Sequence, residues 1–73
     1  MFNIGDIITG NENNPYSITN ENAIMVVTDI IDCEDEEITV RVLKHYARED
    51  TIGEKFNVFC GEFSKINERG TEW

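Results

Sequence analysis

Two neighbouring segments in the middle of this 73-residue sequence carry apolar side chains at every second position. In the segment 37–44, the apolar residues Ile38, Val40 and Val42 alternate with Thr39, Arg41 and Leu43. Such alternation is typical of a β-strand, because successive side chains of a strand point to opposite faces. The segment 23–32 is apolar on both alternating faces, as in a strand that bends across a barrel. A polar turn at 33–36 separates the two segments, so the sequence predicts a β-hairpin.

The remaining segments predict short strands and loops, and none shows a sustained apolar stripe with the 3.6-residue period of a helix. They are an apolar segment at 2–9 with a bulge or tight turn at Gly5-Asp6, inside or just before a strand, a loop at 10–22 with one 3-10 turn around 15–18, a loop at 45–55, a strand at 55–60, and a 3-10 turn or short final strand at 63–66. A sandwich of seven strands does not fit into 73 residues. We therefore expect an all-β fold, a small five-stranded, partly open barrel with a short 3-10 turn. It forms a single domain over 1–66, followed by a polar tail at 67–73.

Three short stretches of the chain carry a resemblance to a known group of proteins. They are Phe2-Asn3-Ile4-Gly5-Asp6-Ile7-Ile8, Tyr16-Ser17-Ile18-Thr19-Asn20 and Ile38-Thr39-Val40-Arg41-Val42-Leu43-Lys44-His45. This pattern resembles small bacteriophage and prophage proteins that open with a Phe-x-x-Gly-Asp strand and continue into a Tyr-x-Ile-Thr-Asn loop. The resemblance implies an SH3-like small β-barrel, and it runs from Phe2 to about Phe63. The chain departs from the group in its very acidic turn at 32–37.

The charge of the chain is strongly negative, with fifteen Asp and Glu against six Lys and Arg and a formal net charge of −9. Such a field repels nucleic acid and anionic membrane surfaces, whose binding requires cationic side chains. It attracts basic surfaces and accelerates encounters with them. We therefore expect neither direct nucleic-acid binding nor membrane binding, and we expect a partner with a basic surface. The alternative is that the charge only keeps a small protein in solution.

The acidic turn and its surroundings are the candidate partner-binding site. The predicted contact residues are Asp29, Asp32, Glu34, Asp35, Glu36, Glu37 and Tyr16. The acidic run has no glycine and no flanking helices, unlike an EF-hand, so we expect no metal site. Its carboxylates resemble a phosphate backbone in charge density, although the run could also be a solvated hairpin tip. For Tyr16, the alternative is that its ring closes one end of the barrel.

No arrangement of residues predicts catalysis or a cofactor. His45 is the single histidine, has no nucleophile placed beside it, and is expected at the surface at a strand end. Cys33 lies in the acidic turn, where its pKa would be raised, and Cys60 is expected to act as a small core residue. The two cysteines lack metal-site spacing, and a disulfide between them is an alternative that the sequence does not decide. With no signal peptide or membrane span recognisable, we expect a cytoplasmic protein with reduced thiols, in the host cell if phage-encoded.

These features favour a non-enzymatic, phage-type protein-binding module. We hypothesise that it inhibits a host defence protein that handles nucleic acid, such as a nuclease, in the manner of an anti-CRISPR protein. It would act as a nucleic-acid mimic, as a monomer or dimer, by covering a basic surface. The alternative is a structural or accessory phage protein that oligomerises and has no inhibitory activity.

Overall fold

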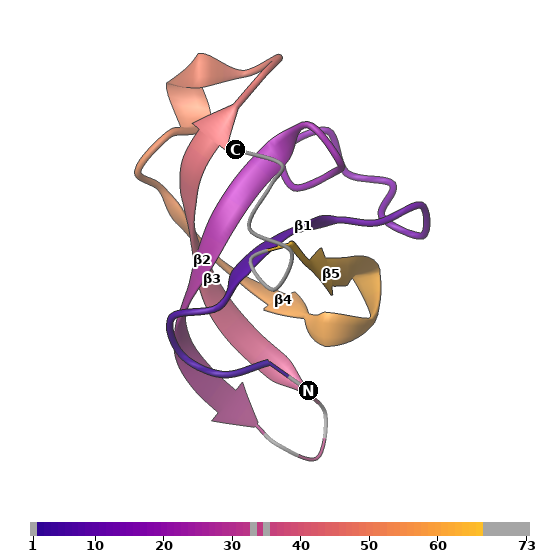
Figure 1. Cartoon of the computed structure of the whole chain (residues 1–73), viewed down its shortest axis with the longest axis vertical. Coiled ribbons are helices and arrows are strands. Elements are labelled where there is room, and N and C mark those ends of the chain that lie inside the picture. Colours follow the sequence, from indigo (N-terminus) through magenta and orange to yellow (C-terminus); the bar gives the residue numbers. More distant parts are fainter. Residues whose placement is uncertain (1, 33, 35, 67–73) are drawn as a thin grey trace.

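The computed structural model describes residues 2–32, 34 and 36–66, and its strands form one antiparallel sheet (Figure 1). The elements are β1 (Ile7–Gly10), β2 (Ala23–Asp32), β3 (Glu37–His45), the 3-10 turn η1 (Glu49–Thr51), β4 (Lys55–Phe59), the 3-10 turn η2 (Cys60–Glu62) and β5 (Phe63–Lys65). The strand order is β4-β3-β2-β1-β5, so β4 and β5 are the two edges and the sheet is not closed. The prediction of an all-β, five-stranded, partly open barrel with a short 3-10 turn is therefore confirmed.

The β2–β3 hairpin is the largest element of the fold, and the alternating side chains of its strands contribute most of the core. Pairs such as Met25 with Val42 and Val27 with Val40 lie opposite each other on the inner face. The core consists of Phe2, Ile8, Ala23, Met25, Val27, Ile38, Val40, Val42, Cys60 and Phe63. Because one face of each strand is buried here, a register slip by one residue would expose this whole apolar set.

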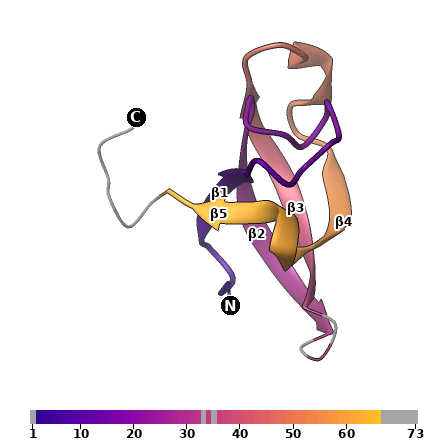
Figure 2. The same ribbon diagram turned by 90° about the vertical axis from the view of Figure 1, so that its right-hand side faces the viewer.

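Three register shifts bend the hairpin so that the sheet can curl around its core. They lie between Ile24 and Met25, between Val27 and Asp29, and between Ile30 and Asp32. Irregularities of this kind bend a strand and increase its twist. In Figure 2 the short strand β5 lies across the long β2–β3 hairpin, as expected of a curled sheet. The curl leaves an open seam between β4 and the long loop that joins β1 to β2.

The boundaries of some predicted elements differ in the structure. In the segment 2–9 the strand begins at Ile7, so the tight turn at Gly5-Asp6 lies just before the strand, which is one of the two expected arrangements; the backbone turns at Asn3–Asp6 with Gly5 at a φ of 97°. This turn is closed by the amide of Asp6, which donates to the carbonyl oxygen of Asn3 at 3.0 Å. Phe2 nevertheless packs into the core.

The 3-10 turns of the structure, η1 and η2, lie outside the two segments in which the sequence predicted one, 15–18 and 63–66. The segment 15–18 holds a single hydrogen-bonded turn, in which the Thr19 amide donates to the Tyr16 carbonyl at 3.3 Å. The segment 63–66 contains β5, the short final strand that was one of the two alternatives, and η2 directly precedes it. The expected polar tail at 67–73 lies outside the described residues.

Candidate functional site

The acidic residues predicted as a contact site lie at the far end of the β2–β3 hairpin. We call the described members of this group the acidic tip, which comprises Asp29, Asp32, Glu34, Glu36 and Glu37. Asp29, Glu34 and Glu36 are exposed, whereas Asp32 and Glu37 are half-buried. Two further members of the acidic turn, Cys33 and the predicted contact residue Asp35, lie outside the described residues.

Local backbone geometry holds the acidic tip in shape. The carboxylate of Asp32 accepts a hydrogen bond of 2.8 Å from the amide of Glu34, an arrangement that favours a tight turn. Glu36 has a φ of 55°, in the left-handed region. Its carbonyl oxygen accepts a 3.0 Å hydrogen bond from the amide of Cys60, which joins the turn to the start of η2.

The salt bridges of the described residues do not involve Asp29, Glu34, Glu36 or Glu37 of the acidic tip. Within residues 2–32, 34 and 36–66 there are two salt bridges, Arg48 with Asp50 and Lys65 with Asp6. The ammonium of Lys44 lies 5.1 Å from the centre of the Tyr46 ring. Arg41 and Lys55 face each other across β3 and β4, and Arg41 lies two residues along β3 from Thr39, the partner of Asp29. Four carboxylates of the tip, those of Asp29, Glu34, Glu36 and Glu37, therefore carry negative charge that no salt bridge in the described part of the chain neutralises.

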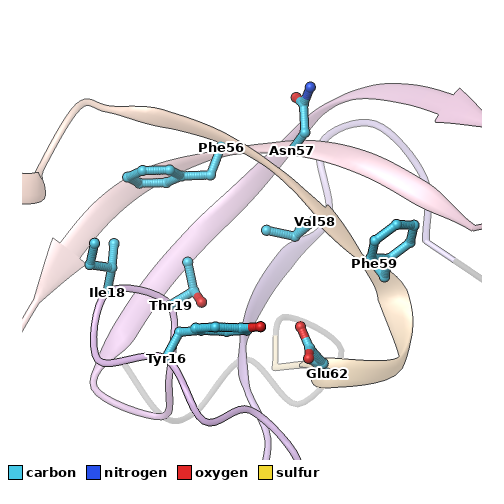
Figure 3. A pocket seen from close by; sticks show the side chains of 8 residues that line it. All are labelled: Tyr16, Ile18, Thr19, Phe56, Asn57, Val58, Phe59 and Glu62. Carbon is cyan, nitrogen blue, oxygen red and sulfur yellow. The ribbon is translucent and has the colours of Figure 1, made fainter.

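An apolar groove lies beside the acidic tip, at the open seam of the barrel. We call it the β4 groove, and its volume is about 350 Å³. It is lined by Tyr16, Ile18, Thr19, Phe56, Asn57, Val58, Phe59 and Glu62. One wall comes from the β1–β2 loop and the other from β4 and η2 (Figure 3). Its volume is at the lower end of the range that small-molecule and peptide-side-chain pockets occupy.

Two aromatic residues at the groove are well exposed. Tyr16 is 59% exposed and Phe59 is 55% exposed. The alternative in which the Tyr16 ring is buried as a plug at one end of the barrel is therefore wrong, and the ring instead lines the groove (Figure 3). Exposed aromatic rings beside a groove are the residues that most often anchor protein interfaces.

The acidic tip and the β4 groove meet at one pair of residues. Phe59 at the end of β4 pairs with Glu37 at the start of β3. In Figure 3 the carboxylate of Glu62 points toward the space between the Tyr16 ring and Val58. The groove therefore combines apolar walls with a carboxylate of its own, and the acidic tip extends this charge beyond Phe59.

The loop wall of the groove is fixed by side chains that hydrogen-bond to its backbone. The side-chain nitrogen Nδ2 of buried Asn14 donates to the Thr19 carbonyl oxygen at 2.9 Å. Its side-chain oxygen Oδ1 accepts a hydrogen bond from the backbone amide of Tyr16 at 2.9 Å. Gly10 makes the close approach of the loop to β1 possible, because a Cβ at this position would collide with the Thr19 carbonyl oxygen. These contacts place Tyr16 and Ile18 opposite β4.

His45 is not on the surface, which corrects the sequence prediction. The residue is only 2% exposed, and its Nδ1 accepts hydrogen bonds from the amides of Ala47 at 3.0 Å and Arg48 at 2.8 Å. Because Nδ1 is an acceptor, Nε2 carries the proton and donates to the carbonyl oxygen of Ser17 at 2.9 Å. Both ring nitrogens thus form hydrogen bonds with backbone groups, and His45 connects the β1–β2 loop to the β3–β4 loop.

Cys60 behaves as the small core residue that the sequence predicts. It is 7% exposed and belongs to the core cluster. Burial, and to a smaller degree the charge of Glu36, raises the pKa of its thiol above the ordinary value of 9.0. The thiol is therefore protonated and a poor nucleophile near neutral pH.

Three further properties of the described residues bear on function. They contain no group of three or more His, Cys, Asp or Glu placed to hold a metal ion. No helix among them has the length and apolarity needed to cross a membrane. Comparison of the chain with protein-family models, with curated proteins and with solved structures found no match.

Sequence reasoning missed the β4 groove. Tyr16 and Ile18 are far in sequence from Phe56 and Phe59, and only the curl of the folded sheet brings them together. The one available signal was the high apolar content of 56–59 next to a loop that is long for a hairpin connection.

Proposed function

We propose that this protein is a non-enzymatic binding module whose acidic tip contacts the basic surface of another protein. The observation that carries the proposal is that four carboxylates of the tip, those of Asp29, Glu34, Glu36 and Glu37, form no salt bridge with a described cation. Like charges brought together in this way are unfavourable in the isolated molecule, and a cationic partner relieves the repulsion.

The favoured partner is a protein that binds nucleic acid, such as a nuclease of a host defence system. A groove that accepts DNA or RNA is lined with Lys and Arg. A hairpin tip that carries several carboxylates can enter such a groove and occupy the positions of the phosphates. The result would be competitive inhibition, and the resemblance to bacteriophage and prophage proteins agrees with this role.

Binding to a panel of purified basic nucleases tests the proposal. At least one nuclease should bind, and binding should weaken when ionic strength rises from about 50 mM to about 500 mM, because salt screens exposed charges. A variant with Asp29→Asn, Glu34→Gln, Glu36→Gln and Glu37→Gln should bind at least about tenfold more weakly.

A matched control separates the position of the charges from their number. The exposed residues Glu12, Glu21, Glu49 and Glu54 lie outside the tip, and their replacement by Gln changes the net charge by the same amount. The control variant should retain most of the affinity. Equal losses in the two variants, or no binding by any nuclease, would contradict the proposal.

A further inference from the structure

The groove runs along the free edge of β4. This strand pairs with β3 on one side, from Glu37 opposite Phe59 to Arg41 opposite Lys55, and no strand of the described part of the chain neighbours it on the other. Among the described residues, no backbone hydrogen bond crosses the groove from β4 to the β1–β2 loop. The edge of β4 therefore faces the groove without a main-chain partner from the loop.

Consecutive residues of β4 line the groove, which is the mark of an accessible strand edge. The residues 56–59 all contribute to the lining. In Figure 3 the side chain of Asn57 points away from Tyr16 and Ile18, whereas Phe56 and Val58 point toward the loop. Asn57 thus contributes main-chain atoms, so the groove gives access to the backbone of β4 as well as to its side chains.

The two edges of the sheet differ in how they are protected. The edge strand β5 has three residues, and its Lys65 is held by Asp6 at 3.6 Å. Very short edge strands with charged side chains resist pairing with other chains. The edge strand β4 has five residues and therefore spans about 16 Å at about 3.3 Å per residue. It is the edge on which an additional strand would fit.

We propose that the β4 groove binds an extended segment of a partner protein, which adds to the sheet as a strand beside β4. The segment alternates apolar and basic residues, because successive side chains of a strand face opposite sides. Its apolar residues contact Phe56, Val58 and Ile18, and its Lys or Arg residues face Glu62 and the acidic tip. Main-chain hydrogen bonds to an edge supply affinity, and the pockets for alternate side chains supply specificity.

The charge of the groove selects this occupant over an acidic or uncharged one. The Glu62 carboxylate forms no salt bridge with a described cation, and Glu37 lies beside Phe59 at the same end. This inference rests on the proposed function, since it identifies the part of the basic partner that would be held next to the acidic tip.

Calorimetric titration with short end-blocked peptides tests the inference. The first peptide alternates Val and Lys, the second alternates Val and Glu, and the third is the Val–Lys peptide N-methylated at alternate backbone nitrogens on its pairing edge. Only the first peptide should bind, with at least about tenfold higher affinity than the others. N-methylation removes main-chain donors and leaves the side chains in place, so equal binding of the third peptide would overturn strand addition.

Two single substitutions in the protein locate the peptide. Glu62→Gln should weaken binding of the Val–Lys peptide several-fold, and the exposed Glu21→Gln, outside the groove, should leave it unchanged. Equal effects of the two changes would overturn the assignment to the β4 groove. A proline-rich peptide of the same length that binds as tightly as the Val–Lys peptide would also overturn it, since proline cannot supply the edge hydrogen bonds.

The peptide titrations, taken together with the nuclease-binding measurements, distinguish failure of this inference from failure of the proposed function. If the Val–Lys peptide does not bind the unmodified protein, while a nuclease binds it and loses affinity for the tip variant, only the inference fails. If the peptide binds as expected, while no nuclease distinguishes the tip variant from its control, only the proposed function fails.

Discussion

Nε2 of His45 lies 2.9 Å from the carbonyl oxygen of Ser17, and this hydrogen bond connects the end of β3 to the loop that forms one wall of the β4 groove. The same imidazole accepts two backbone amides from the β3–β4 loop through Nδ1. One buried side chain thus fixes both long loops of the fold. Because Ser17 lies between Tyr16 and Ile18, which line the groove, the shape of the groove depends on this buried imidazole.

His45→Ala should therefore destabilise the protein and loosen the groove. The substitution removes a buried imidazole and leaves two partly buried backbone donors and one acceptor without their partner, at a cost of up to about 1–3 kcal/mol for each group that water does not reach. Urea unfolding should show a free energy of unfolding lower by about 2 kcal/mol or more. Lys44→Ala is the control at the adjacent exposed position, where loss of the contact with Tyr46 should cost about 0.5–1 kcal/mol. Equal losses in the two variants would contradict the role of His45.

Gly10→Ala should destabilise the protein because the β1–β2 loop packs directly on the glycine. The added Cβ would collide with the Thr19 carbonyl oxygen, so the loop would have to move. Strain of this kind costs about 1–3 kcal/mol. Gly61→Ala is the matched control, since nothing lies within 4 Å of a Cβ there, and it should change stability by less than about 0.5 kcal/mol. Thermal unfolding of both variants measures the difference, and a stable Gly10→Ala protein would show that the loop is not held against β1.

Phe59→Ala should affect binding far more than stability. The Phe59 side chain is 55% exposed, so its removal should cost less than about 1 kcal/mol of unfolding free energy. Phe63 is in the core, and Phe63→Ala should cost about 3–5 kcal/mol. Affinity for the Val–Lys peptide should fall about tenfold in Phe59→Ala, as for an aromatic anchor at the centre of an interface. Unchanged affinity in a folded Phe59→Ala protein would remove Phe59 from the binding surface.

The raised pKa of Cys60 predicts a loss of stability in alkaline solution. Below the ordinary value of 9.0, the thiol is protonated in the folded and unfolded states, and its contribution to stability is fully present. Above 9.0 the unfolded chain releases the proton first, so the contribution falls until the folded thiol ionises as well.

Comparison of two proteins isolates this titration from that of Tyr and Lys. Both carry Cys33→Ser, and one also carries Cys60→Ala. Urea unfolding in the presence of a reductant should show a steeper fall in unfolding free energy above pH 9.0 for the protein that retains Cys60. Parallel pH profiles for the two proteins would contradict burial of the thiol as the cause.

The parts of the fold that depend on local pattern could be predicted from the sequence. Alternation over Ile38, Val40 and Val42 identified the inner face of β3, and the acidic turn was correctly placed between two strands. The surroundings of His45 could not be predicted in this way. Its burial depends on pairing with Ala23 and on the path of the β1–β2 loop, both of which are set by tertiary packing.

The candidate site was only partly predictable for the same reason. The carboxylates of the acidic tip are contiguous in sequence or nearly so, whereas the β4 groove is assembled from the β1–β2 loop, β4 and η2. Tyr16 was a candidate from its residue type alone. That its ring lies opposite Phe56 and Val58 follows from the strand order together with the curl of the sheet, which no local pattern encodes.

Amide chemical-shift mapping with the Val–Lys peptide tests most directly whether the acidic tip and the β4 groove form one binding surface for a basic segment. We predict that the largest changes occur at 56–59, at Glu62 and at Glu36 and Glu37, and that they shrink together when salt is raised. Changes confined to β5 and the Asn3–Asp6 turn, or equal changes with the Val–Glu peptide, would contradict the account.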